Sequence, residues 1–310
     1  RDGQYLHYLT RWMHALGRAA EACQQPRLGR WARELALTAL QAFGHETPSG
    51  RRHLFWKMSI DLSRPLVPSM GHHDPLDAYL TALELTALEP TTLEAGSQTD
   101  GQTGRAEASA ELGKRSLEAE IDALEPLVRD GRWATGDPLG LGGLMTDADR
   151  AFQIEVRGER RVAGLAVELT RAAQEGLRSL LHGPPWEAPA DRRLPFRELG
   201  LAIGLEALGA LRERCRTRSE TPEWTRSEAE RLLESLDALL VHRRLGMELI
   251  DFWLDPRHRQ SSTWTAHEDI NDVMLATAIA PSGHLDLRLD GEGHREGAGG
   301  SGSPRMEAGF

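Results

Sequence analysis

Residues 56–79 read WKMSIDLSRPLVPSMGHHDPLDAY, and this stretch decides how the fold is interpreted. From Leu54 to Asp61, apolar and polar residues alternate with a period of two, which predicts a short strand or hairpin arm. Asp74 and Pro75 then supply a helix N-cap and a proline at the first helical position. The stretch therefore predicts a strand-bearing connection that ends at a helix over 75–88.

This connection follows a helix predicted over 27–43 and is about 30 residues long, far more than the handful usual between helices. It is dense in reactive side chains, whereas a disordered linker or a plain connection has no need of them. A second polar stretch, TWTAHEDIND at 263–272, has a similar character. We expect the two stretches to meet in one site, together with residues 133–149.

The rest of the chain is predicted to be helical, with only a trace of strand. Apolar residues recur at helical spacing in nine segments, of which the eighth is broken near 242–246: 4–20, 27–43, 75–88, 114–130, 144–156, 160–182, 195–211, 228–254 and 266–280. The composition of 89–113 predicts a mobile surface insertion, and that of 287–310 a disordered tail. We expect residues 1–286 to form one all-α domain, with further residues preceding Arg1.

Composition narrows the function classes. The chain has 310 residues, and its hydrophobic content of 40% excludes disorder of the whole chain. Its net charge of -10 argues against a nucleic-acid or membrane-surface partner. No apolar run approaches the roughly 20 residues that span a bilayer. Two separated cysteines give neither a disulfide framework nor a zinc motif, so we expect a cytoplasmic protein, with a signal before Arg1 left open.

Helices of two kinds alternate along the chain. Segments 27–43 and 160–182 are amphipathic, whereas 195–211 and 272–280 are apolar nearly all round, which is typical of an outer and an inner layer. With WMHAL (12–16), HHDPLD (72–77) and TWTAHEDIN (263–271), the pattern resembles the α/α toroids, which include six-hairpin glycosidases and N-acylglucosamine 2-epimerase-like isomerases. The resemblance implies an incomplete α/α toroid that acts on a small-molecule carbohydrate, without a cofactor or metal. It transfers no family residue to this chain.

Glycoside hydrolysis requires two carboxyl groups, one of which is held protonated. The loops and helix ends supply eight candidates: Asp61, Asp74, Asp77, Asp147, Asp149, Glu198, Glu268 and Asp269. Capping of helix N-termini is the competing explanation for Asp74 and for Glu268, which forms a capping-box pair with Thr265. Both interpretations remain open at this stage.

Sugar epimerisation requires a base on each face of the ring, for which histidine titrates in the right range. We expect His72 or His73 to face His267, so the catalytic candidates are His72, His73, Asp74, His267, Glu268 and Asp269. Aromatic faces and polar groups that suit sugar binding give the substrate-binding candidates Arg11, His14, Trp56, Lys57, Asp61, Arg64, Trp133 and Trp264. The competing explanation is a solvated basic face for Arg11 and His14, and core packing for each tryptophan.

Two other classes of protein function remain compatible with the sequence. His73-Asp74 is the dipeptide of HD-type metal phosphohydrolases, but here it precedes a proline at a helix start. A non-catalytic helical binding or scaffold protein is the remaining alternative. Hydrolase and epimerase, the identity of the sugar and the oligomeric state are not distinguished by the sequence.

Overall fold

The computed structural model describes residues 2–87, 117–218 and 226–287. The described part is mostly helical with a few very short strands, so the expected all-α class is confirmed. The predicted insertion at 89–113 lies outside the described residues, as does the predicted tail from residue 288 onward.

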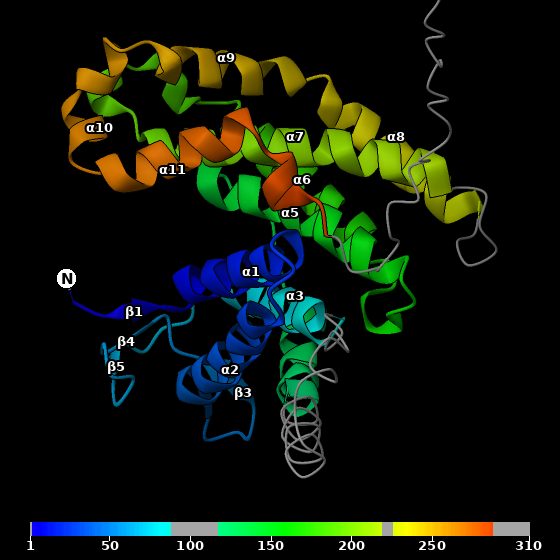
Figure 1. Cartoon of the computed structure of the whole chain (residues 1–310). Coiled ribbons are helices and arrows are strands. Elements are labelled where there is room, and N and C mark those ends of the chain that lie inside the picture. Colours follow the sequence, from blue (N-terminus) through cyan, green and yellow to red (C-terminus); the bar gives the residue numbers. More distant parts are fainter. Residues whose placement is uncertain (1, 88–116, 219–225, 288–310) are drawn as a thin grey trace, which may run out of the picture.

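Five helices form an inner series in which each packs on the next (Figure 1). They are α1 (Leu6–Ala22), α3 (Asp74–Ala87), α5 (Pro138–Glu155), α7 (Pro195–Arg218) and α11 (Glu268–Ile279). Side-chain pairs show that α1 and α3 are parallel, because Thr10 bonds Asp77, and His14 bonds Glu84 one turn later on α1 and two turns later on α3.

Helices α5 and α7 run parallel to α1 and α3. The ring of His73 lies beside Gly140 at the start of α5, and Glu84 meets Arg150 further along both helices. Gly142 packs against the backbone of α7 near its start, and Asp149 pairs with Arg214 near its end. The N-terminal ends of α1, α3, α5 and α7 therefore lie at the same end of the inner series.

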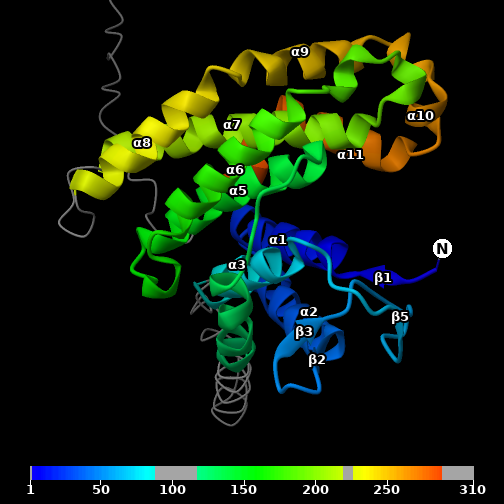
Figure 2. The ribbon, with the colours of Figure 1, turned by 180° about the vertical axis from the view of Figure 1, so that it is seen from behind.

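A second layer of helices covers this series from outside. Helix α2 (Pro26–Phe43) returns along α1, and α6 (Leu165–Leu180) returns along α5. Helices α8 (Arg226–Leu240) and α9 (Arg243–Leu254) run back along α7 in succession, with the break between them close to the predicted position (Figure 1). A further helix spans 117–129, and Figure 2 shows the connection that leads from it to the start of α5.

Short strands occupy the long connection between α2 and α3. Of the strand predicted over 54–61, only Leu54 and Lys57–Met58 lie in strands, because residues 59–64 form a turn in which Ser59 and Ser63 donate to Asp61. Strand β2 (Gly44–Glu46) pairs antiparallel with β3 (Arg52–Leu54). Strand β4 (Lys57–Met58) lies between β1 (Gln4–Tyr5) and β5 (Pro65–Val67), and both pairings are antiparallel. The connection is thus folded against the N-terminal residues of the chain.

The start of α5 differs from the prediction. The glycine-rich residues 136–143 were expected to be a connection before a helix over 144–156, but α5 already begins at Pro138. The Asp137 carboxylate caps this helix by accepting the Gly140 amide at 2.8 Å, and Pro138 stands at its first position. The glycine at 142 is required inside the helix because an added Cβ would lie 2.0 Å from the Gly200 carbonyl oxygen.

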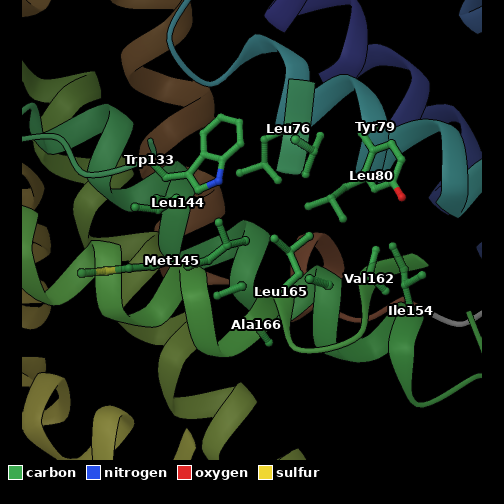
Figure 3. Close-up of a cluster of buried hydrophobic side chains, with 14 of the residues drawn as sticks. Leu76, Tyr79, Leu80, Trp133, Leu144, Met145, Ile154, Val162, Leu165 and Ala166 are labelled. Atoms are coloured by element: carbon green, nitrogen blue, oxygen red, sulfur yellow. The ribbon is translucent and has the colours of Figure 1, made fainter. Parts of the chain in front are cut away.

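The segment predicted as one helix over 160–182 is divided. A 3₁₀ turn spans Arg160–Val162, and α6 begins at Leu165 after Gly164, whose φ of 76° breaks the helix. Apolar side chains from α3, α5, α6 and the connection before α5 fill the space between these elements (Figure 3). Trp133 lies in this core beside Leu76 and Leu144, with 4% of its surface exposed.

Candidate active site

Arg150 forms the centre of a buried polar cluster that three inner helices share. Its side chain is 1% exposed, and its guanidinium donates through Nη1 to the Oδ1 atoms of Asp77 and Asp147, both at 3.0 Å. Through Nη2 it donates to Thr81 Oγ1 at 2.8 Å and to Glu84 Oε2 at 3.0 Å. One cation therefore binds three carboxyl groups from α3 and α5.

Helix α1 supplies the other side of this cluster. Thr10 Oγ1 donates to Asp77, and His14 Nδ1 lies 2.8 Å from Glu84 Oε1. Arg11 Nη2 lies 3.6 Å from Asp77 Oδ1, and the Arg11 side chain is 40% exposed. Arg11 and His14, in the polar stripe of α1, therefore contact carboxylates of α3 rather than forming a wholly solvated face. Arg11 connects the cluster with the surface.

The carboxyl groups of the cluster have opposed pKa values. Burial alone would raise the pKa of Asp77, but Arg11 and Arg150 outweigh it and hold the pKa at about 2. Burial, followed by the charge of Asp77, raises the pKa of Asp147 to about 6 and that of Asp74 to about 7. At neutral pH, Asp77 is therefore ionised, whereas Asp74 is partly protonated.

The geometry of these carboxyl groups is compact. Asp77 Oδ1 and Asp147 Oδ1 are each 3.0 Å from the same Arg150 nitrogen, so they lie within about 6 Å of each other. Asp74 precedes Asp77 by three positions, which places them on one face of α3 with Cβ atoms about 5–6 Å apart. Asp74 Oδ2 is buried and has no hydrogen-bond partner.

The adjacent histidines tie two loops together. His72 Nε2 contacts the carbonyl oxygen of Arg132, and His73 Nε2 lies 2.8 Å from that of Trp133. Burial is the main cause that lowers the pKa of His73. The loop before α3 is therefore fixed to the connection before α5, at the N-terminal end of both helices.

The two polar stretches lie along the same end of the inner helices but do not face each other. Asp137 pairs with Arg197 at 2.6 Å, and the neighbouring Phe196 ring lies 5.6 Å from the ring of His267. The starts of α5 and α7 thus stand between His73 and His267. His267, Glu268 and Asp269 are exposed at the start of α11, and the proposed Thr265–Glu268 capping box is not formed, because Thr265 Oγ1 donates to the Ser261 and Ser262 carbonyls instead.

Besides Arg11 and His14, which contact the buried cluster, the substrate-binding candidates separate into three groups. Trp56 is 39% exposed and contacts Tyr5, over whose ring Lys57 Nζ lies at 4.6 Å, close to the start of α1. Asp61 and Arg64 lie on an exposed turn, where Asp61 accepts hydrogen bonds from Ser59 and Ser63. The indole rings of Trp133 and Trp264 are buried and pack in the core, as the competing explanation predicts.

Hollows occur at the other end of the inner helices. A hollow of about 790 Å³ lies between α7, α8 and the C-terminal residues, and is lined by Glu206, Arg212, Asp237, Arg243 and Asp286 among others. A smaller one of about 200 Å³ is lined by Gln153, Arg157, Arg214 and Leu287. Neither includes a residue of 56–77 or 264–272.

Within the described ranges, no group of three or more His, Cys, Asp or Glu side chains is arranged to hold a metal ion. No described helix is long and apolar enough to cross a membrane. A scan against protein-family models, a search of curated proteins and a search of solved structures each returned no match.

Sequence reasoning named Asp74, Arg11 and His14 for this region but missed Thr10, Thr81, Glu84 and Arg150. A signal was available in helix α3, where Asp77, Thr81 and Glu84 follow each other at helical spacing in an otherwise apolar segment. All three are buried on the face that meets Arg150. In α5 no such signal exists, because the helix is buried on nearly every side.

Proposed function

We propose that the protein is a glycoside hydrolase of the α/α-toroid type, with Asp74 as the general acid and Asp77 as the partner carboxylate. One observation carries this proposal: two carboxyl groups on one turn of α3 have pKa values of about 7 and about 2. Carboxyl pairs whose surroundings drive their pKa values apart are the hallmark of acid–base catalysis at a glycosidic bond.

The surroundings of Asp74 and Asp77 give the two carboxyl groups different catalytic roles. Asp74 is partly protonated at neutral pH and has an oxygen without a partner, so it can donate a proton to the leaving-group oxygen. Asp77 stays ionised because Arg11 and Arg150 lie beside it, so it can stabilise or attack the developing cation. Their spacing on the helix suits the separation of about 5–5.5 Å in retaining enzymes better than the wider inverting one.

Exposed aromatic rings on α1 suit a sugar as substrate, and they lie on the face of the helix opposite to Thr10 and His14, which contact the carboxyl cluster. Tyr8 and Trp12 are 50% and 63% exposed on one face of α1, and Trp56 lies near its start. Arg11 is on the same helix and reaches Asp77. Flat rings next to a charged group that contacts a carboxylate provide both a stacking surface and hydrogen-bond donors for a pyranose.

The helix arrangement supports the toroid part of the proposal. In an α/α toroid, parallel inner helices are each followed by an antiparallel outer helix, and α1–α2, α5–α6 and α7–α8 have this order. The long connections at 44–73 and 131–137 lie at the N-terminal end of the inner helices. Asp74 is at this end, so a substrate held by these loops would reach Asp74 first.

The other classes have less support. Epimerisation by facing histidines lacks a pair, since His72 and His73 contact backbone carbonyls and His267 lies beyond the start of α7. The HD-type phosphohydrolase lacks a ligand set in the described residues. A scaffold protein is favoured by the pairing of Arg150 with three carboxyl groups, because a buried ion-pair cluster can serve fold specificity alone.

The test compares the parent protein with Asp74→Asn and Asp77→Asn on a panel of α- and β-linked aryl and alkyl glycosides. We expect Asp77→Asn to lose nearly all turnover. Asp74→Asn should lose about 10²–10⁴-fold on alkyl glycosides. On 2,4-dinitrophenyl glycosides, whose leaving group needs no protonation, the first equivalent of dinitrophenolate should be released at close to the parent rate. Later turnovers should be slower, because Asp74 also serves as the base that activates water for hydrolysis of the glycosyl-enzyme. Asp237→Asn, which alters an exposed pair with Arg212, is the matched control.

Thermal unfolding of each variant separates a chemical role from a structural one. If the folded Asp74→Asn variant hydrolyses both substrate types as fast as the parent, the assignment of the general acid is wrong. If the parent hydrolyses no member of the panel while Asp77→Asn lowers only the unfolding temperature, the scaffold interpretation replaces the hydrolase.

A further inference from the structure

Two histidines face each other across the hairpin formed by β2 and β3. His45 and His53 are register partners in this antiparallel pair, so both side chains lie on one face of the ribbon. Their ring centroids are 5.2 Å apart, with an angle of 62° between the ring planes. Both belong to the long connection, away from the carboxyl cluster described above.

One ring nitrogen of each histidine, Nδ1, lacks a hydrogen-bond partner. Nδ1 of His45 and Nδ1 of His53 are both buried from solvent and make no hydrogen bond. A buried nitrogen without a partner is unfavourable, and two such atoms on adjacent rings point to a missing shared ligand. The other adjacent pair differs, because His72 and His73 each direct Nε2 to a backbone carbonyl.

The ring separation fits a metal ion held by both imidazoles. With metal–nitrogen bonds of about 2.1 Å and a tetrahedral angle, two imidazole centroids on one ion lie about 5 Å apart. The hairpin holds this geometry through the bond from the Phe55 amide to the Phe43 carbonyl at 2.9 Å. Phe55 also stacks on the His45 ring at 3.9 Å and fixes its orientation.

A neighbouring cation is paired with a carboxylate. Arg52 precedes His53 on the other face of the ribbon by register, and its guanidinium pairs with Glu120 and donates to the Leu40 carbonyl at 3.0 Å. The Glu120 carboxylate offsets part of this positive charge, and the remainder contributes to lowering the pKa of His45.

We propose that His45 and His53 form a two-histidine site for a borderline divalent transition metal such as Zn²⁺ or Cu²⁺, with water completing the coordination. Imidazole is the ligand that these ions favour among neutral side chains. Two protein ligands leave positions open, so the expected affinity is micromolar rather than that of a four-ligand structural site. The ion would clip β2 to β3 at the base of the connection 44–73. This inference is independent of the proposed hydrolase activity.

The experiment titrates the full-length, chelator-treated protein with Zn²⁺ by calorimetry. We expect one site in the parent and at least a tenfold loss of affinity in His45→Gln and in His53→Gln, each checked for fold by circular dichroism. The matched control is His72→Gln with His73→Gln, whose rings are 4.5 Å apart but whose Nε2 atoms face carbonyls. Its Zn²⁺ affinity should stay within twofold of the parent.

A second readout requires no variant. Substoichiometric Cu²⁺ should broaden the ring proton signals of His45 and His53 in NMR spectra before those of the other ten histidines of the chain. The site is disproved if His45→Gln binds Zn²⁺ as tightly as the parent, if the affinity is lost in the His72/His73 control instead, or if Cu²⁺ broadens other histidines first.

Discussion

At the scale of single residues, burial decides which charges matter in this protein. Arg150 is buried with three carboxyl groups and a hydroxyl around it, so removal of the guanidinium would leave uncompensated charge in the core. Surface pairs such as Arg51–Asp130, whose side chains are mostly exposed, contribute little by comparison. Stability and pH dependence therefore arise mainly from the interior carboxyl groups.

Asp149 gives the clearest pH dependence outside the proposed catalytic pair. It is fully buried on α5, where Gln153 donates to Oδ2 at 2.9 Å and Arg214 lies 3.4 Å from Oδ1. Burial is the main cause that raises its pKa to about 7; Arg214 opposes this shift, and Asp286 adds to it. In the unfolded chain the same carboxyl group has its ordinary pKa of 3.8.

The raised pKa of Asp149 determines the direction in which stability changes with pH. Because the folded pKa is the higher one, the stabilising contribution of protonated Asp149 is fully present below about pH 4 and is lost as the pH rises through about 7. Asp149→Asn does not titrate. We therefore expect its stability relative to the parent to increase from pH 5 to pH 8, by up to about 1.4 kcal/mol per pH unit below the folded pKa.

Urea unfolding of both proteins at four pH values between 5 and 8 measures this difference. The exposed Asp122, changed to Asn, serves as control and should give a constant difference across the range. A constant difference for Asp149→Asn as well would contradict the raised pKa.

At the scale of elements, helix starts were predictable where a short polar signal marks them. Asp74-Pro75 gave the start of α3 to within one residue, and Asp137-Pro138 carries the same signal for α5. The second was overlooked because the glycines that follow it are typical of a loop. Tertiary packing requires glycine here, because Gly142 meets the backbone of α7 at Gly200. No local sequence pattern reveals which helix comes that close.

The α5–α7 crossing makes a matched pair of glycine substitutions informative. In Gly142→Ala, the new Cβ would lie 2.0 Å from the Gly200 carbonyl oxygen, so the helices must separate. We expect a loss of about 1–3 kcal/mol in the free energy of unfolding. In Gly143→Ala, nothing lies within 4 Å of the new Cβ, and the better helix propensity should stabilise the protein by up to about 1 kcal/mol.

Thermal and urea unfolding of the two variants provide the measurement. Adjacent positions on one helix share the same propensity gain, so the difference between them reports the crossing alone. Equal stabilities of Gly142→Ala and Gly143→Ala would show that α5 and α7 do not approach each other as closely as described.

At the scale of the whole molecule, the all-α class followed from helical periodicity. The contrast between amphipathic and apolar helices was a poorer guide to burial, because α11, apolar by sequence, leaves Val273 and Ile279 more than half exposed. The convergence of α1, α3 and α5 on Arg150 did not follow, because it joins residues more than 60 positions apart through a side chain whose helix is buried on nearly every side. Residues 72–77 and 264–272 were expected to meet, but the starts of α5 and α7 lie between them.

The C-terminal residues of the described chain close this assembly. Helix α12 (Ser282–Leu285) and the residues after it, orange-red in Figure 1, lie against α1 and α5. His14 Nε2 lies 3.0 Å from the His284 carbonyl oxygen. Gln153 donates to the Leu285 carbonyl at 2.9 Å and accepts the Leu287 amide at 2.8 Å. One glutamine thus holds two backbone groups of this segment.

Gln153→Ala tests whether that side chain anchors the segment 282–287. The substitution leaves the Leu285 carbonyl and the Leu287 amide without their partner, which costs about 1–3 kcal/mol in a buried setting. We expect hydrogen exchange of the Leu287 amide to accelerate by at least tenfold, because this amide depends on the Gln153 oxygen. Amides in the middle of α5 and α7 should exchange at the parent rate, since their helix bonds are unchanged.

Gln174→Ala is the matched control, because Gln174 also donates to one backbone carbonyl, that of Ser235, but lies on α6 away from the segment. It should leave the exchange of Leu287 unaffected. If Leu287 exchanges at the same rate in Gln153→Ala and in the parent, contacts such as the one from His14 hold the segment by themselves. If the whole chain exchanges faster instead, the segment is part of the global folding unit and not a separately opening strap.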